Sequence, residues 1–171
     1  KYQLPLLLKE LERINTIVED MLTVARPASP QLMHMSMKEI LNELPKNLLF
    51  NDSMHVTIQL DDTKLLVDPK QMKQVLYNLI RNSVESMDGI GRLSIYSVKK
   101  EQTYEIYIKD SGTGMDEATE KAVFNPFFTS KETGTGLGLT IVQRIIDDHH
   151  GKIEVFETSK NGTTFLITLP L

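Results

Sequence analysis

The chain has 171 residues, which suits one sizeable domain or a domain with a short appendage. Hydrophobic residues make up 40% and charged residues 25%, the balance of a globular protein rather than of a disordered or fibrous one. The formal net charge of −4 supplies no basic field, so we expect neither nucleic acid nor an anionic membrane as a partner. The absence of cysteine excludes disulfides, thiolate metal sites and cysteine nucleophiles.

Residues 1–26 predict a long helix, because apolar residues recur at alternating spacings of three and four, as in a heptad seam. One helix cannot bury such a stripe alone, so we expect it to pack in a helical bundle. Pro27 and Pro30 predict a hinge at residues 27–30, since proline lacks an amide donor. A compact domain is expected over residues 31–171. The seam consists of Leu4, Leu7, Leu11, Ile14, Val18, Met21 and Ala25.

The first residue is not methionine, and no apolar run approaches the ~20 residues of a transmembrane helix. We therefore expect a cytoplasmic piece of a longer protein, which includes the cytoplasmic part of a membrane-anchored sensor. We expect no membrane contact within this piece itself.

Short strands and helices alternate after the hinge. Ser36 and Glu39 form a capping-box pattern, which predicts a helix that runs to about residue 48. Asp68 and Pro69 begin a second amphipathic helix, expected to reach residue 87. Strands are predicted at residues 55–60, 64–67, 92–99, 103–110, 152–157 and 163–169, and a further helix at 137–149. This order predicts an α+β fold with helices packed on one face of a mixed sheet.

The first motif, Asp110-Ser-Gly112-Thr-Gly114, ends the strand predicted at 103–110. Asp110 falls on the same face as the apolar residues of this strand, because strand side chains alternate with period two. A buried carboxylate needs hydrogen-bond donors, and the glycines let the backbone approach a flat ligand closely. Adenine meets both demands through its exocyclic amine. An Asx turn at the strand end is the alternative interpretation.

The second motif, Gly134-Thr-Gly136-Leu-Gly138-Leu139, runs directly into a helix. Three glycines at spacing two can turn backbone N–H groups toward an anion, and a helix N-terminus adds partial positive charge. The motif therefore indicates a phosphate cradle, with a flexible helix-entry loop as the alternative. Its spacing fits neither a dinucleotide fingerprint nor a P-loop. Lys131 and Arg81 are candidate phosphate cations, and a solvated surface charge is the alternative for each.

The third motif lies on the long helix. Asn78, Asn82 and Glu85 follow one another at spacings of four and three, which places them on one face, away from the main apolar stripe. Carboxamide oxygens suit a magnesium ion that phosphates already hold. Two asparagines in an otherwise good helix need a reason, since asparagine has poor helix propensity. A solvated polar face is the alternative.

Together these motifs resemble the N, G1, F and G2 boxes of sensor histidine kinases. Asn78…Asn82 is similar to the N box, and Phe124-Asn-Pro-Phe127-Phe128 to the F box. The resemblance covers roughly residues 38–171 and is nearest to the sporulation- and nitrogen-type kinases. Because the boxes occur in the family's order, this interpretation is preferred over the separate alternatives. The other two boxes are the Asp110–Gly114 and Gly134–Leu139 motifs, and Gly162-Thr163-Thr164-Phe165 resembles the family's final glycine motif.

The resemblance implies a two-layer α/β sandwich of the Bergerat type, preceded by one long helix of a helical-bundle dimerisation domain. It implies ATP with Mg²⁺ beneath a mobile lid at residues 111–135. Because Phe124, Phe127 and Phe128 are large apolar residues of this segment, we expect them to anchor the closed form of the lid. Asn82 is expected to hold the metal and Asp110 the adenine. The full set of implied ATP-contacting residues is Asn78, Arg81, Asn82, Asp110, Gly112, Gly114, Phe128, Lys131, Gly134, Thr135, Gly136, Leu137, Gly138 and Thr163.

The implied activity is transfer of the γ-phosphoryl group of ATP to a histidine upstream of this chain. His34, His55, His149 and His150 do not fit the family's acceptor box, so we assign no catalytic residue here and expect no autophosphorylation by this chain alone. The resemblance implies a homodimer through the N-terminal helix of the longer protein. It also implies a response regulator or phosphorelay receiver as a partner, and an inhibitor protein on the helical domain.

Three alternative functions stay open. A phosphate-releasing ATPase related to gyrase, MutL and Hsp90 is disfavoured, because those proteins carry a water-activating glutamate where this chain has Asn78. A serine kinase of the anti-sigma type shares the fold but typically lacks a heptad helix and hinge in front. A nucleotide-sensing dimerisation module without catalysis is the third.

Overall fold

The computed structural model describes residues 29–49, 53–131 and 134–171, together with the single positions Leu11, Ile14, Val18 and Met21. These four positions are helical, and each side chain is about half exposed. The rest of the predicted heptad seam, and Pro27 of the predicted hinge, lie outside the described residues.

The main sheet has five strands in the order β2-β4-β5-β7-β6. Strands β2 and β4 are parallel, whereas each of the other neighbouring pairs is antiparallel. The sheet is therefore mixed, as the element order predicts. The strands are β2 (Met54–Gln59), β4 (Gly91–Lys99), β5 (Thr103–Asp110), β6 (Lys152–Ser159) and β7 (Gly162–Pro170).

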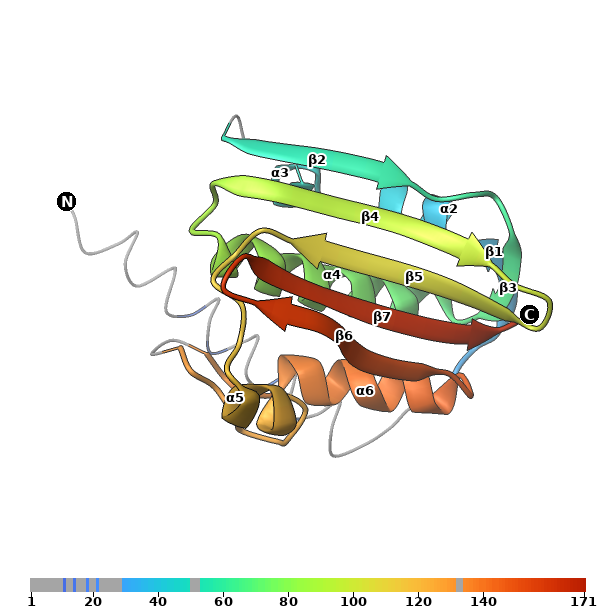
Figure 1. The fold of residues 1–171 in the computed structure, drawn as a ribbon. Coiled ribbons are helices and arrows are strands. Elements are labelled where there is room, and N and C mark those ends of the chain that lie inside the picture. The colour runs from blue at the N-terminus through green and yellow to red at the C-terminus, as the bar shows by residue number, and fades with distance from the viewer. Residues whose placement is uncertain are drawn as a thin grey trace.

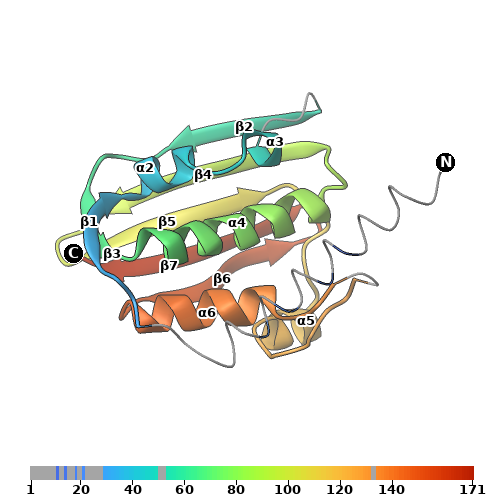
Figure 2. The same ribbon diagram turned by 180° about the vertical axis from the view of Figure 1, so that it is seen from behind.

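Helices α2 (Met37–Asn42), α4 (Pro69–Ser86) and α6 (Gly138–Asp148) lie on the same face of this sheet (Figure 2). The opposite face, turned toward the viewer in Figure 1, carries no helix in the described part of the chain. The core fills the space between the two layers and is formed by side chains such as Leu79 of α4 and Ile106 of β5, both fully buried. The predicted two-layer α/β sandwich is thus confirmed.

The predicted start of α4 is confirmed in detail. Asp68 is the N-cap residue, and its Oδ1 accepts hydrogen bonds from the backbone N–H groups of Lys70 (2.9 Å) and Gln71 (3.1 Å). Pro69 occupies the first turn, where its missing N–H leaves no bond unmade. The buried stripe of the helix includes Met72, Val75, Leu76, Leu79 and Ile80.

The helix predicted to reach residue 48 is shorter than expected. The Ser36–Glu39 capping box forms, but α2 ends at Asn42, and a separate short helix, α3, covers Lys46–Leu49. Pro45 lies between them, and a proline cannot donate the backbone hydrogen bond that a continuous helix requires. The capping box therefore predicted the start of the helix correctly but not its length.

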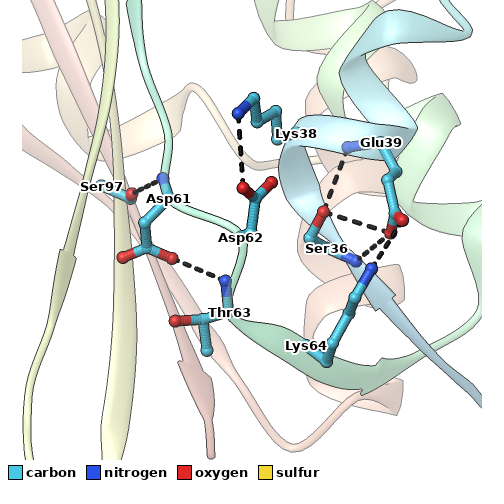
Figure 3. Close-up of polar contacts among 8 residues, drawn as sticks. All are labelled: Ser36, Lys38, Glu39, Asp61, Asp62, Thr63, Lys64 and Ser97. Carbon is cyan, nitrogen blue, oxygen red and sulfur yellow. Dashed lines mark hydrogen bonds and ion pairs between the residues drawn. The ribbon is translucent and has the colours of Figure 1, made fainter.

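Strand β1 (Met33–Ser36) pairs antiparallel with β3 (Lys64–Val67) in a second, two-stranded sheet. Figure 3 shows how this sheet is tied to α2: Glu39 accepts hydrogen bonds from the Ser36 N–H and from Lys64 Nζ, the latter at 2.5 Å. The Lys64 ammonium, helped by that N–H, lowers the pKa of Glu39 to about 2. Nearby, Lys38 pairs with the exposed Asp62 at 3.4 Å (Figure 3).

The C-terminus of α6 is joined to the N-terminus of α4. The backbone N–H of Asp68 donates to Nε2 of the buried His149 at 2.9 Å, so Nδ1 carries the proton that faces the Ile145 carbonyl at 2.7 Å. Asp68 Oδ2 also accepts from the Gln31 N–H at 2.7 Å, which ties the chain just after the expected hinge to the same point. His149 thus serves as the C-terminal cap of α6.

Candidate functional site

Asp110 ends β5 with only 4% of its surface exposed. Its Oδ1 accepts hydrogen bonds from the backbone N–H groups of Gly112 (2.9 Å) and Thr163 (3.1 Å), which offset the cost of burying a carboxylate. The Gly112 bond is the Asx turn considered as the alternative. Within the part of the chain that the structure describes, no hydrogen bond reaches Oδ2. Asp110 therefore retains a free acceptor at the end of the sheet.

The glycines around Asp110 are required by the fold itself. A Cβ on Gly114, which has φ +68°, would lie 1.7 Å from the Ser159 carbonyl oxygen. A Cβ on Gly162, which has φ +129°, would lie 2.0 Å from the carbonyl oxygen of Asp110. Gly112 is likewise pressed against Ser86. These glycines admit neighbouring protein atoms, a role that sequence reasoning missed because the neighbours are distant in the chain.

Asn78 is not part of a solvated face. It is 5% exposed, and its Nδ2 donates to the carbonyl oxygen of Gly138 at 3.4 Å. The expectation that it lies away from the buried stripe is therefore wrong, because α6 packs against this side of α4. Asn82, one turn further along α4, is partly exposed. The contact with Gly138 brings the expected N box beside the start of α6.

The glycine loop turns sharply before α6. Gly136 has φ +69°, and its carbonyl accepts a hydrogen bond from the Phe127 N–H at 3.0 Å. The buried Leu137 anchors the loop, and its N–H donates to Thr135 Oγ1 at 3.3 Å. Gly134 is exposed, and a Cβ there would meet the Thr129 hydroxyl. No side chain caps the N-terminus of α6, so an anion can be bound by its first N–H groups.

Gly138 differs from the other glycines of this loop. A Cβ on it would meet only Asn78 and Arg81 Nη2, each at 3.8 Å, which is ordinary van der Waals contact. The fold therefore has no need of a glycine at this position. A methyl group at this position would lie against Asn78 and the Arg81 guanidinium without displacing either.

The two candidate cations are both paired with Glu85. Lys131 Nζ lies 2.5 Å from Glu85 Oε2, and Arg81 Nε lies 3.6 Å from Glu85 Oε1. The Arg81 guanidinium also lies over the Tyr77 ring, 5.8 Å from its centroid. Neither cation is simply a solvated surface charge. Sequence reasoning missed this role of Glu85, although its position four residues after Arg81 signals a helical ion pair.

The three phenylalanines that are expected to anchor the closed lid differ in their packing. Phe124 is partly buried and packs edge-to-face on Phe165 with 6.4 Å between ring centroids. Phe127 is 66% exposed and has φ +64°, so it is not packed. The hydrogen bond from its N–H to Gly136 holds this backbone conformation, which a non-glycine residue rarely adopts. Phe128 is partly exposed.

The 111–135 segment contains the short helix α5 (Glu117–Ala122), which has no buried residue. Asp116 caps it by accepting from the Thr119 N–H at 2.7 Å, and bonds from Thr119 hold the pKa of Asp116 below its ordinary value. At the segment's start, the Met115 N–H donates to Thr158 Oγ1, and Thr158 in turn contacts the Thr163 hydroxyl.

A metal at this site would depend on amide oxygens. Among the described residues, no group of three or more histidine and acidic side chains is arranged to hold a metal ion. Asn78 and Asn82 supply neutral oxygens, which suit a magnesium ion bound mainly by phosphates and water.

Within the described residues there is no helix both long and apolar enough to cross a membrane.

Known proteins resemble this chain along most of its length. Residues 67–171 match the family described as histidine kinase-, DNA gyrase B- and HSP90-like ATPase. AtoS, a signal transduction histidine-protein kinase of Escherichia coli, is 33% identical over 98% of this chain. Sporulation kinase A of Bacillus subtilis is 33% identical over 94% of it. The chain spans only 29% and 28% of these two relatives.

Solved structures agree with the sequence relatives. The Acinetobacter baumannii histidine kinase AdeS superimposes with a TM-score of 0.80 at 26% identity, covering 96% of this chain and 81% of AdeS. The catalytic domain of the histidine kinase ThkA gives a TM-score of 0.74 at 30% identity, covering 82% of this chain and 95% of that domain. This chain therefore belongs to the family of histidine kinase-, DNA gyrase B- and HSP90-like ATPases, with the fold of a histidine kinase catalytic domain.

Proposed function

We propose that this chain is the ATP-binding catalytic part of a sensor histidine kinase. The observation that carries the proposal is that α4 contacts both candidate motifs: Gly112, two residues after Asp110, is pressed against Ser86 of α4, and Asn78 of α4 donates to Gly138 at the start of α6. In the proposed reaction, a P–N bond forms between the γ-phosphorus and a histidine imidazole outside this chain, while the bond to the leaving ADP oxygen breaks. Such transfer depends on positioning and charge neutralisation.

Asp110 would recognise adenine. Its Oδ1 is occupied by two backbone N–H groups, whereas Oδ2 can accept from an exocyclic amine. A guanine carbonyl at the same place would face a carboxylate and be repelled. This arrangement favours ATP over GTP.

The phosphates would lie near the N-terminus of α6. Gly138 lies beside Asn78 and Arg81, and the first N–H groups of α6 have no side-chain cap. Asn82 would hold Mg²⁺, which would shield the phosphate charge when bound. Asn78 would orient the same phosphates through its amide. ShkA, which shares this fold with a TM-score of 0.80, has been solved in complex with the ATP analogue AMPPNP.

A receiver protein and a dimeric helical domain complete the proposal. ThkA has been solved in complex with the response regulator TrrA, and that match covers 99% of this chain at 26% identity. We propose an equivalent partner here. We further propose that residues 1–26 belong to a dimerisation domain, that residues 27–30 form a hinge, and that the longer protein acts in the cytoplasm.

The central experiment compares Asp110→Asn with Asp62→Asn. Asp62 is exposed and lies in the connection from β2 to β3, beside α2 (Figure 3), so its change should leave nucleotide binding intact. Asp110→Asn should weaken binding of an ATP analogue by about 1.5–3 kcal/mol, typical of a hydrogen bond to a charged group. Calorimetry measures both variants. Equal affinity of Asp110→Asn and the unchanged protein would contradict the adenine assignment.

A second experiment tests catalysis directly. Labelled ATP is incubated with this chain and a separate helical domain that bears an acceptor histidine. Acid-labile label on histidine is the expected result. Acid-stable label on serine would indicate the serine-kinase alternative, and free phosphate alone would indicate an ATPase.

A further inference from the structure

The Glu85 carboxylate lies between two cations that come from different parts of the chain. Arg81 precedes it by one turn of α4, whereas Lys131 belongs to the 111–135 segment. Each carboxylate oxygen faces one cation, at 3.6 Å for Arg81 Nε and 2.5 Å for Lys131 Nζ. The ion pair thus joins Lys131 to the C-terminal end of α4, which is distant from it in the sequence.

The Glu85 carboxylate thus occupies a position between two cations that a phosphate group could also occupy. Arg81 Nη2 lies 3.8 Å from the position that a Cβ on Gly138 would occupy, so the cluster borders the proposed phosphate position. In the described part of the chain, Glu85 is the acidic residue that pairs with both cations. A phosphate that approaches Lys131 therefore competes with the Glu85 carboxylate, because the two anions repel each other.

We propose that Glu85 is a built-in competitor of the nucleotide phosphates for Lys131. Without nucleotide, Glu85 holds Lys131 against α4. When nucleotide binds, its phosphates take over Lys131 and release it from Glu85. This inference rests on the proposed function, because it assumes a polyphosphate ligand at the start of α6.

The expected effect is modest, because the side chains of Lys131 and Glu85 are 38% and 43% exposed. Exposed ion pairs contribute up to about 1 kcal/mol, which corresponds to about a fivefold change in an equilibrium constant. Salt should reduce the effect, because mobile ions screen exposed charges. The competition is therefore weak enough for a nucleotide to overcome.

The first experiment needs no nucleotide. Trypsin cleaves after Lys131 only when the lysine side chain leaves Glu85, so Glu85→Gln should speed this cleavage severalfold, as followed by mass spectrometry. The matched control is Glu117→Gln, which breaks the Glu117–Lys121 ion pair of α5 in the same segment and should not change cleavage after Lys131. Equal cleavage rates after Lys131 in Glu85→Gln and the unchanged protein would overturn the proposal.

The second experiment measures affinity for an ATP analogue. Glu85→Gln should bind it about two- to fivefold more tightly, because the competing carboxylate is gone. In a Lys131→Met background the same change should have no effect, since the contested cation is absent. Weaker binding by Glu85→Gln would overturn the proposal, because it would mean that Glu85 supports the ligand. So would an equal gain in both backgrounds, which would indicate general charge repulsion.

The two experiments separate this inference from the proposed function. If the unchanged protein binds no nucleotide, the proposed function fails, while the trypsin experiment still decides whether Glu85 restrains Lys131. If nucleotide binds and depends on Asp110, but Glu85→Gln changes neither measurement, the proposed function stands and the competition is refuted.

Discussion

The two ends of the candidate site are held by different forces. At Asp110, a carboxylate that is 4% exposed accepts two backbone hydrogen bonds, and the glycines beside it allow backbone contacts that a Cβ would block. At Lys131, an ion pair with partly exposed side chains joins the 111–135 segment to α4. Buried hydrogen bonds resist rearrangement, whereas exposed ion pairs exchange readily with ions and ligands. The Asp110 end is thus preformed, and the Lys131 end can be rearranged.

The same contrast holds for the packing of the two regions. Strand β5 contributes the fully buried Tyr104, Ile106 and Ile108, whereas α5 has no buried residue. In the 111–131 part of the segment, Met115 and Phe124 are the partly buried apolar residues that pack against the core. Few buried contacts make a region inexpensive to open locally. Substitutions in each region test how far this division holds.

The largest expected effect is at Gly162. An alanine there would have φ +129° and a Cβ 2.0 Å from the Asp110 carbonyl oxygen, so β7 would have to shift away from the preformed end. We expect Gly162→Ala to lower the free energy of unfolding by about 3 kcal/mol, as measured by chemical denaturation. Nucleotide affinity should fall with it, because Thr163 holds Asp110 in place.

The matched control for this change is Gly138→Ala. A Cβ there meets only ordinary contacts, and alanine suits the start of a helix, so stability should stay the same or rise by up to about 1 kcal/mol. Its nucleotide affinity should nevertheless fall, because the methyl group would stand beside Asn78 and Arg81, where the phosphates are proposed to bind. A stable variant with unchanged affinity would show that phosphates do not approach Gly138.

Phe124 and Phe127 belong to the same motif, but the ring of Phe124 is packed and the ring of Phe127 is not. Phe124→Ala should destabilise the fold by about 2 kcal/mol, since the partly buried ring packs on Phe165. Phe127→Ala should change stability by less than about 0.5 kcal/mol, because its ring is 66% exposed. Thermal denaturation of both variants decides. Equal losses would mean that the whole motif belongs to the preformed region.

Asn82 tests the metal assignment at the rearrangeable end. Asn82→Ala should remove most of the Mg²⁺-dependent part of nucleotide affinity, about tenfold or 1.4 kcal/mol, and leave magnesium-free binding nearly intact. The measured quantity is the ratio of affinities with and without Mg²⁺. A ratio identical to that of the unchanged protein would refute the assignment.

The smallest expected effect is the loss at acidic pH of the stability that Asp68 contributes. Burial raises the pKa of Asp68, but the backbone N–H groups of Gln31, Gln71 and Lys70 outweigh it, so the pKa lies below its ordinary value. The stability contributed by ionised Asp68 is therefore complete above about pH 4, the range of an unfolded carboxyl, and is lost as the pH falls through the lower folded pKa. The stability difference between the unchanged protein and Asp68→Asn should shrink across that acidic window.

The sequence predicted most elements because their signals are local. Asp68 and Pro69 start α4 through bonds within one helical turn, and strand alternation placed Asp110 in the buried row of β5 without knowledge of its neighbours. The main error, a helix continued to residue 48, also has a local cause in Pro45. The proline indicates where the helix must end, whereas the capping box indicates only where it begins.

The tertiary structure alone decided the relations between distant segments. Nothing near Asn78 in the sequence shows that α6 buries it, and nothing near Lys131 shows that Glu85 binds it. The left-handed backbone of Phe127 likewise depends on its bond to Gly136. Local patterns determine which residues form each helix, strand and motif, because those forces act between near neighbours in the chain. Which side chains meet depends on how the layers pack, and this decided how the two ends of the site are held.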